Sequence, residues 1–221
     1  MILRKIYSKI YRKLYPNEPW FVPGATKYLL KLGLKPLMLG GEHSITAGAV
    51  EAIAEYKPDL IVIQLDAHAD LREEWIGSCH NHACTMRRCL EVLPSEQVLQ
   101  LGIRSGTRQE FEELKETKRL ISFTQGQPAT ALDKALTPHL GKPIYMTVDL
   151  DWFDPSVMPG TGTPEPGGFF WKDFASVIDV LQKHQLIAAD IVELAPQLDP
   201  SGISSILAAK VSRSLLMLLN K

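Results

Sequence analysis

The stretch LIVIQLDAHADLR, residues 60–72, joins an apolar run to three polar side chains. Residues 60–65 have the length and the apolar composition of a strand that is buried on both faces of a sheet. Asp66, His68 and Asp70 follow at every second position, so an extended chain would direct these side chains to one side. Carboxylates and imidazoles are common ligands of divalent metals. The stretch therefore predicts a buried strand with candidate metal ligands at its carboxyl end.

Comparable apolar runs recur along the chain, separated by segments of helical length. The candidate strands are residues 36–40, 60–65, 97–103, 143–150 and 186–194, with a weaker one at 119–123. The candidate helices are residues 45–56, 82–92, 107–117, 127–138, 171–184 and 203–219. Alternating apolar strands and helices favour a mostly parallel sheet with helices on both faces. We therefore expect an α/β fold, a three-layer α/β/α sandwich, formed by residues 1–221 as a single domain.

Composition narrows the choice of partners. The chain has 221 residues, of which 45% are hydrophobic, and a formal net charge of −1. This small charge gives no reason to expect nucleic acid or an anionic membrane as a partner, and no apolar run approaches the ~20 residues of a membrane span. Cys79, Cys84 and Cys89 lack the spacing of a disulfide framework or of a structural zinc site. We expect reduced thiols and a cytoplasmic protein.

Residues 1–20 differ from the rest of the chain. Basic residues and regularly spaced apolar residues precede Pro16, and no acidic residue occurs before Glu18. This pattern predicts a basic amphipathic helix. A targeting or membrane-surface segment would fit the charge, but the stretch has no apolar h-region and no small-residue cleavage site. A helix packed at the edge of the domain is the interpretation that we favour.

Polar side chains collect where several of the expected strands end. The first strand runs into GGEHS, which contains His43, and the strand at 143–150 leads to Asp149 and Asp151. Glu193 lies near the end of the last strand. In open α/β sheets, ligands bind at the carboxyl ends of the strands. We therefore expect these residues to meet the polar triplet, Asp66, His68 and Asp70, at one edge of the sheet.

Each motif also has a purely structural interpretation, because Asp, Ser and His at strand ends often cap helices or close turns. Their joint occurrence at expected strand ends favours a metal centre. Four neighbouring carboxylates would repel one another unless cations neutralised them. Two divalent ions bridged by an Asp would do so, and this oxygen-rich ligand set favours Mn²⁺ over Zn²⁺, with Mg²⁺ and Fe²⁺ less favoured. A pair of ions activates water, so we expect metal-assisted hydrolysis.

The motifs GGEHS, DAHADLR and DLDWFDPSVMPGTGTPEPGG, in this order, resemble those of the ureohydrolases, the manganese family of arginases and agmatinases. The resemblance covers residues from about 33 to 221, and GTGTPEPGG and SCHNHACTMRR are more similar to agmatinases than to arginases. It implies an arginase-like sandwich, shortened here at its N-terminus, and a homo-oligomer. It also implies two Mn²⁺ ions per chain, one held by His43, Asp66, Asp70 and Asp149 and the other by Asp66, His68, Asp149 and Asp151.

The same resemblance implies roles for three residues. Glu193 matches the family's glutamate that pairs with the substrate guanidinium, and His82 matches its proton-exchanging histidine. A metal-bridging hydroxide would attack the guanidinium carbon, and Asp70 would help to pass a proton to the leaving amine. His82 has a second interpretation, as a solvent-facing histidine at the start of a helix. The expected substrate is a guanidino compound, and agmatine would yield urea and putrescine.

Other functions stay open at this point. Arginase, guanidinobutyrase and formiminoglutamase would share the metal ligands and differ in their contacts with the far end of the substrate. A metal-binding but inactive member of the family is a further alternative, because few residues precede the first motif. A binuclear phosphoesterase also uses Asp and His clusters, but the order of the ligands and the lack of an Asn or further His motif argue against it.

Overall fold

Five parallel strands form one sheet in the order β1-β5-β4-β2-β3. The computed structural model describes residues 21–121 and 127–221. The strands are β1 (Leu37–Leu39), β2 (Ile61–Leu65), β3 (Val98–Leu101), β4 (Pro143–Asp149) and β5 (Gln185–Val192). Each lies within one of the five stronger strand predictions or within one residue of it, and the prediction of a parallel sheet is confirmed.

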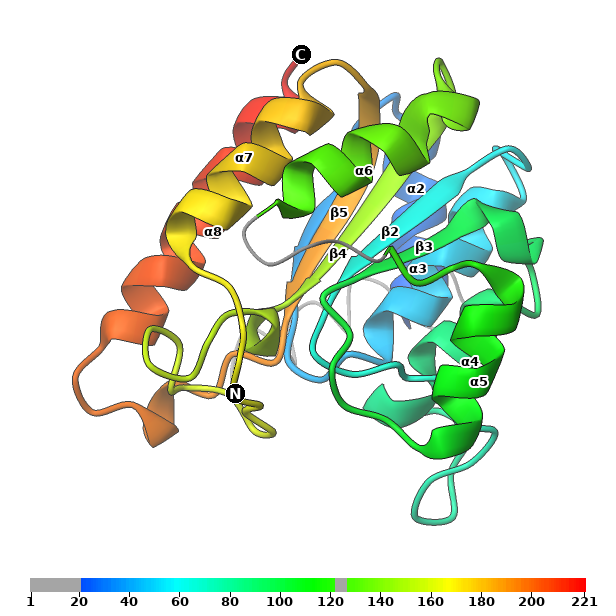
Figure 1. Ribbon diagram of the computed structural model, residues 1–221. Coiled ribbons are helices and arrows are strands. Elements are labelled where there is room, and N and C mark those ends of the chain that lie inside the picture. Colours follow the sequence, from blue (N-terminus) through cyan, green and yellow to red (C-terminus); the bar gives the residue numbers. More distant parts are fainter. Residues whose placement is uncertain (1–20, 122–126) are drawn as a thin grey trace.

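Helices cover both faces of this sheet and complete the three layers (Figure 1). One face carries α6 (Pro128–Leu136), α7 (Trp171–Leu181) and α8 (Ile203–Leu219), with α7 and α8 on the left of Figure 1 and α6 at its upper middle. The other face carries α2 (Phe21–Lys31), α3 (Ile45–Ala54), α4 (Thr85–Cys89) and α5 (Arg108–Thr117). Within the described ranges, no helix is both long enough and apolar enough to cross a membrane.

Successive side chains of a strand point to opposite faces of the sheet, so the strands contribute to a hydrophobic cluster on each face. Ile61, Ile63 and Leu65 of β2 pack in the cluster under α6, α7 and α8. Val62, between them, packs in the cluster under α3, α4 and α5. All five residues of β2 are buried. A strand covered on both sides is expected to be mainly apolar, which explains why β2 shows no polar alternation and has Gln64 as its one polar residue.

Two predicted elements differ from the structure. Of the strand predicted at 119–123, the described residues 119–121 form only an isolated bridge between Gln100 and Leu120. The helix predicted over 82–92 is a 3₁₀ turn at His82–Cys84 followed by the short α4. The N–H groups of Met86 and Arg87 both donate to the carbonyl of Asp70, so the first turn of α4 is tied to the segment that follows β2. The helix predicted within residues 1–20 lies outside the described residues.

The connections create a crevice at the carboxyl ends of β2 and β4. The chain leaves β2 through α4 and returns to β3 on one side, whereas it leaves β4 through α7 and returns to β5 on the other side. Neighbouring strands whose connections run in opposite directions form a topological switch point, where open sheets bind ligands. Asp66 follows β2 directly, and Asp149 is the last residue of β4.

Candidate metal centre

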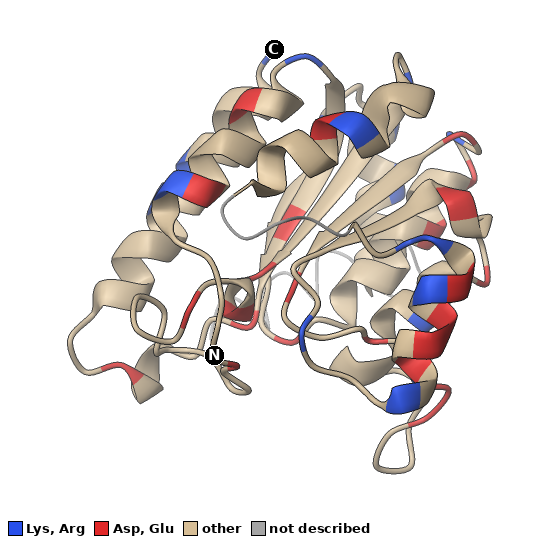
Figure 2. Cartoon of the chain, in the orientation of Figure 1, with Lys and Arg blue, Asp and Glu red and all other residues tan. Residues whose placement is uncertain are grey.

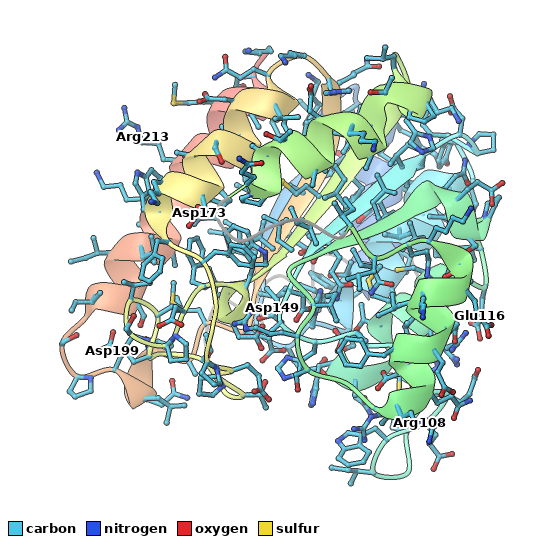
Figure 3. The ribbon with its side chains drawn as sticks, in the orientation of Figure 1. Arg108, Glu116, Asp149, Asp173, Asp199 and Arg213 are labelled. Atoms are coloured by element: carbon cyan, nitrogen blue, oxygen red, sulfur yellow. The ribbon has the colours of Figure 1, made fainter. Side chains whose placement is uncertain are left out.

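All six predicted metal ligands lie at this crevice. Acidic segments gather at the lower ends of the strands in Figure 2, and Figure 3 places Asp149 there, inside the molecule. The ligands come from the carboxyl ends of three strands and from the loops that follow them. His43 follows β1, Asp66, His68 and Asp70 follow β2, and β4 ends in Asp149 with Asp151 two residues on. Five of these side chains are buried and His68 is partly exposed.

Four of these residues form what we call the His43 group. The fully buried Nδ1 of His43 lies 3.1 Å from Oδ2 of Asp70, 3.1 Å from Oδ2 of Asp149 and 3.2 Å from Oδ2 of Asp66. No described residue forms a well-aligned hydrogen bond with this nitrogen. Adjacent ligands of an octahedral ion stand about 3 Å apart, because metal–oxygen distances are about 2.1 Å and the angle between them is 90°. The spacing is that of ligands around one cation.

A second set, the His68 group, shares a residue with the first. Nδ1 of His68 lies 2.9 Å from Oδ2 of Asp151 and 3.6 Å from Oδ1 of Asp66. Asp66 therefore directs one carboxylate oxygen to each group. In Asp149, Oδ2 faces the His43 group, and Oδ1 accepts the N–H of Asp151 at 2.9 Å. Asp66 is thus placed between the two groups, whereas the expected bridging role of Asp149 stays a prediction.

The backbone after β2 differs from the regular extension that the sequence suggested. The strand ends at Leu65, and Asp70 has a φ of 54°, in the left-handed region. Asp tolerates this conformation better than most residues do. The change of direction lets Asp70 face His43 together with Asp66, while His68 faces Asp151. Asp66, His68 and Asp70 all reach the site, as predicted. They do not face one way, because the backbone is not extended after Leu65, so Asp70 joins the His43 group and His68 joins the other group.

Polar side chains inside the strands hold the ligands from behind. Nε2 of His43 lies 2.9 Å from Oγ1 of Thr147, and Nε2 of Gln64 donates to Oδ2 of Asp66 at 2.7 Å. Such partners orient metal ligands and select their tautomers. Neither residue was predicted from the sequence. A signal was present, because each is a polar residue in an otherwise apolar strand, two positions before a ligand and therefore on the same side.

The long loop at 152–168 reaches the site from β4. Oγ1 of Thr163 lies 3.3 Å from Oδ2 of Asp151, and Oε1 of Glu165 lies 3.8 Å from Nε2 of His68. Arg104, which the sequence did not single out, holds this loop by donating to the carbonyls of Asp151 at 2.7 Å and of Glu165 at 2.9 Å. The loop is therefore tied to the His68 group.

The electrostatics of the two groups reflect crowded carboxylates. Burial and the charge of Asp66 raise the pKa of Asp70 to about 8. Burial, with the charges of Asp151 and Asp66, raises the pKa of Asp149 well above its ordinary value. Burial would lower the pKa of His68, but Asp151 and Asp66 raise it to about 11. Without bound cations, protons on the imidazoles must neutralise the negative charge of the carboxylates. This is the behaviour expected of a site that binds cations.

The residues present fit a pair of divalent cations. Two donor groups share one carboxylate, all the donors are oxygen or imidazole nitrogen, and a buried imidazole nitrogen lies among three carboxylate oxygens without an aligned hydrogen bond. In the His43 group, the ligand atoms of His43, Asp66 and Asp70 lie within 4.8 Å of one another. In the His68 group, the same holds for Asp66, His68 and Asp151. These donor types suit Mn²⁺ and Mg²⁺ better than metals that prefer thiolates. Asp66, as the shared residue, would lie between the ions.

A third cluster borders the centre and contains the two remaining predicted residues. Ligand atoms of His82, Glu193 and Glu42 lie within 4.8 Å of one another. Glu193 has a left-handed backbone, with a φ of 64°, and its carboxylate accepts the N–H of His43 at 2.6 Å. Non-glycine residues in this conformation are often held at functional sites. Burial raises the pKa of Glu193. The structure therefore brings His82 and Glu193 together beside the metal ligands.

A cavity of about 280 Å³ opens beside these groups. Its lining includes His68, Asp70, Arg72, Trp75, His82 and Thr163. The guanidinium of Arg72 lies 3.8 Å from the ring centre of Trp75, so the mouth of the cavity carries a cation stacked on an aromatic ring. The volume is close to the lower limit for small-molecule sites.

Comparisons with known proteins agree with this geometry. Residues 22–218 match the model of the Arginase family. The chain is 38% identical to an agmatinase from Halalkalibacterium halodurans over 82% of this chain and 63% of that protein. It is 39% identical to an N(1)-aminopropylagmatine ureohydrolase from Synechocystis over 80% of this chain and 58% of that protein. The chain thus spans less than two thirds of the length of these curated relatives.

Solved structures show the same similarity. The agmatine ureohydrolase of Thermoplasma volcanium matches with a TM-score of 0.78 and 34% identity, over 90% of this chain and 67% of that chain. An arginase from Bacillus subtilis matches with a TM-score of 0.79 and 25% identity, over 88% and 75% of the two chains. The motifs, the sandwich fold and these matches lead to one conclusion: the chain belongs to the arginase family.

Proposed function

We propose that this chain hydrolyses the guanidino group of a small amine, with agmatine as the first candidate substrate and two Mn²⁺ ions as cofactors. The observation that carries the proposal is the pair of donor groups that share Asp66 at the switch point. Its ligand types suit Mn²⁺. When bound, two such ions supply a hydroxide nucleophile at neutral pH by acidifying water. The proposed holders are His43, Asp66, Asp70 and Asp149 for one ion and Asp66, His68, Asp149 and Asp151 for the other.

Glu193 would bind the guanidinium of the substrate. Its carboxylate is half-buried beside the His43 group and is held by the N–H of His43. A carboxylate in this position forms a charge-assisted pair with a guanidinium and turns its carbon toward the centre. Burial raises the pKa of Glu193, and a bound cation would restore its charged form.

Two further residues would handle protons. Asp70 lies in the His43 group and lines the cavity, so it can accept a proton from the attacking nucleophile and pass it to the leaving amine. His82 also lines the cavity and is partly exposed, so it can exchange protons between the site and solvent. Protonation of the leaving amine completes the cleavage of the C–N bond and releases urea.

The choice of substrate rests on the relatives. The agmatinase from Halalkalibacterium halodurans and the aminopropylagmatine ureohydrolase from Synechocystis are about equally similar to this chain. Both names imply an aliphatic amine at the far end of the guanidino compound. N(1)-aminopropylagmatine is therefore a second candidate, ahead of arginine and 4-guanidinobutyrate, which carry a carboxylate.

The decisive experiment measures urea release after the 221-residue chain is loaded with Mn²⁺. Agmatine, N(1)-aminopropylagmatine, arginine and 4-guanidinobutyrate are compared at equal concentration, and bound manganese is counted in the same samples. We expect urea from one of the two amines and two manganese ions per chain. Two bound ions with no urea from any of the four compounds would contradict catalysis and favour an inactive metal-binding member.

The remaining expectations are also part of this proposal. A small-molecule substrate, a cytoplasmic setting and a homo-oligomer fit a member of this family that has a formal net charge of −1. Light scattering on the manganese-loaded chain would measure the mass in solution. A mass of one chain, 24.6 kDa, over the whole range of protein concentrations would contradict the oligomer.

A further inference from the structure

The carboxylate of Glu42 collects donors from two distant segments. On one side, its Oε2 accepts the N–H of Ser44 at 3.0 Å and the Ser44 hydroxyl. On the other side, its Oε1 accepts the N–H of His82 and lies 3.0 Å from Nδ1 of the His82 ring. Glu42 thus joins the loop after β1 to the 3₁₀ turn at His82–Cys84, forty residues away.

This arrangement selects one form of the His82 ring. An ionised carboxylate only accepts hydrogen bonds, so the nitrogen that faces it must carry the proton. Nδ1 of His82 is therefore the protonated nitrogen of the neutral ring, and Nε2 keeps a lone pair. A carboxylate partner is the common device by which proteins fix the tautomer and the orientation of an imidazole.

His82 requires such a partner because packing alone does not hold it. Its side chain is 43% exposed, and that of Glu42 is 42% exposed. The ring lies at the cavity, near the carboxylate of Glu193. An imidazole this exposed would otherwise sample several rotamers and both tautomers, and in many of these the free nitrogen would not be available to the cavity.

We propose that Glu42 is a positioning residue for proton transfer: it holds the His82 imidazole as the Nδ1–H tautomer, with Nε2 free for proton exchange at the cavity. This rests on the proposed function in one respect, the proton transfer by His82. The competing explanation is that Glu42 serves only to tie the loop after β1 to the turn at His82. The two explanations differ in what happens to the ring when the carboxylate is replaced.

The test variant is Glu42→Gln, and the matched control is Ser44→Ala. Four donors converge on the two oxygens of Glu42, and an amide offers one acceptor oxygen in place of two. Ser44→Ala removes a donor from the side of Glu42 that does not face the ring. If Glu42 only ties the loop, both variants should leave the form of the ring unchanged.

The first readout does not depend on turnover. Chains labelled with ¹⁵N-histidine and loaded with diamagnetic Mg²⁺ are studied by long-range ¹H–¹⁵N NMR above the ordinary pKa of histidine, about 6.5. The His82 signals are identified by their loss in His82→Ala. We expect the Nδ1–H tautomer in the wild type and in Ser44→Ala, and a mixture of tautomers in Glu42→Gln. The same tautomer in all three chains, or an Nε2–H tautomer in the wild type, would overturn the proposal.

The second readout is a double-mutant cycle on urea release. We expect Glu42→Gln to lower kcat about tenfold, within the roughly 10–100-fold range seen for residues that orient active groups, with bound manganese unchanged. In the His82→Ala background, Glu42→Gln should have no further effect, because its target is gone. Independent effects of the two changes on kcat would overturn the proposal. Failure of the wild type to release urea would contradict the proposed function, and the NMR result would still decide the role of Glu42.

Discussion

Gly102→Ala tests how the packing behind the metal centre supports it. Gly102 follows β3 and has a φ of 103°. A Cβ atom there would lie 2.3 Å from Nε1 and 2.4 Å from Cδ1 of Trp152, and 3.0 Å from the carbonyl oxygen of Asp66. The indole has little room to retreat, because it is fully buried and stacks on Phe169 at a centroid distance of 4.2 Å.

The expected loss of stability has two parts. A left-handed backbone costs an L-residue about 1–2 kcal/mol, and overpacking of a core typically costs about 1–3 kcal/mol. We therefore expect Gly102→Ala to lower the free energy of unfolding by about 2–5 kcal/mol, the sum of the two parts. Gly141→Ala is the matched control, because Gly141 has a φ of 78° but no atom of the described residues lies within 4 Å of the position that its Cβ would take. It should lose only the backbone part, about 1–2 kcal/mol.

Urea denaturation of metal-free protein would measure both losses, and titration with Mn²⁺ would measure the effect on the centre. Movement of Trp152 should disturb its neighbour Asp151 in the His68 group, so Gly102→Ala should also bind Mn²⁺ more weakly than Gly141→Ala. Equal losses of stability in the two variants would refute the steric reasoning. A large loss of stability with unchanged metal affinity would refute the link between this packing and the centre.

Three further predictions concern the ligands and the core. Asp149→Ala removes a predicted bridging ligand and should abolish both metal loading and urea release; full activity would contradict a binuclear centre. Mn²⁺ affinity should rise with pH, because the metal must displace protons from His43 and His68. The pKa of His43 lies well above its ordinary value, and the pKa of His68 is about 11. At pH values below these pKa values the imidazoles hold their protons, so the gain in Mn²⁺ affinity continues into the alkaline range. Calorimetry in buffers of different ionisation enthalpy would detect the protons that Mn²⁺ binding releases. An Mn²⁺ affinity that is independent of pH would contradict this prediction. Ser204→Ala leaves the N–H of Gly160, which now donates to Oγ of Ser204 at 2.8 Å, without a partner and should lower the free energy of unfolding by about 1–3 kcal/mol, measured by urea denaturation; an unchanged midpoint would show that water replaces the hydroxyl.

Local sequence was sufficient for the five strands, for most of the helices and for the identity of the polar residues at the edge of the sheet. Residues 60–65 are apolar except for Gln64, as expected for a strand buried on both faces, and β2 is found there. Asp66 follows β2 directly and Asp149 is the last residue of β4, and parallel strands bring their carboxyl ends to one edge. Physical reasoning about patterns therefore reached both the sandwich and the position of the centre.

Other features could not be read from local patterns, because they depend on which segments meet. The shift to a 3₁₀ turn and the short α4, where a longer helix was predicted, follows from contacts between Asp70 and the N–H groups of Met86 and Arg87. Glu193 had no role on residue patterns alone and gained one only through the resemblance. Its left-handed backbone and its bond to the N–H of His43 appear only in the folded chain.

The difference between the features that local sequence predicts and those that appear only in the folded chain has a physical cause. The sequence alone determined the five strands, most of the helices and the set of possible ligands, because hydrophobic period and residue chemistry act over a few neighbouring positions. Only the tertiary structure decided that Asp66 faces both donor groups, that Thr147 and Gln64 hold ligands from behind, and that Glu42 reaches His82. These contacts join segments up to about a hundred residues apart, and their geometry depends on how the strands are ordered in the sheet and on where the backbone leaves its regular path.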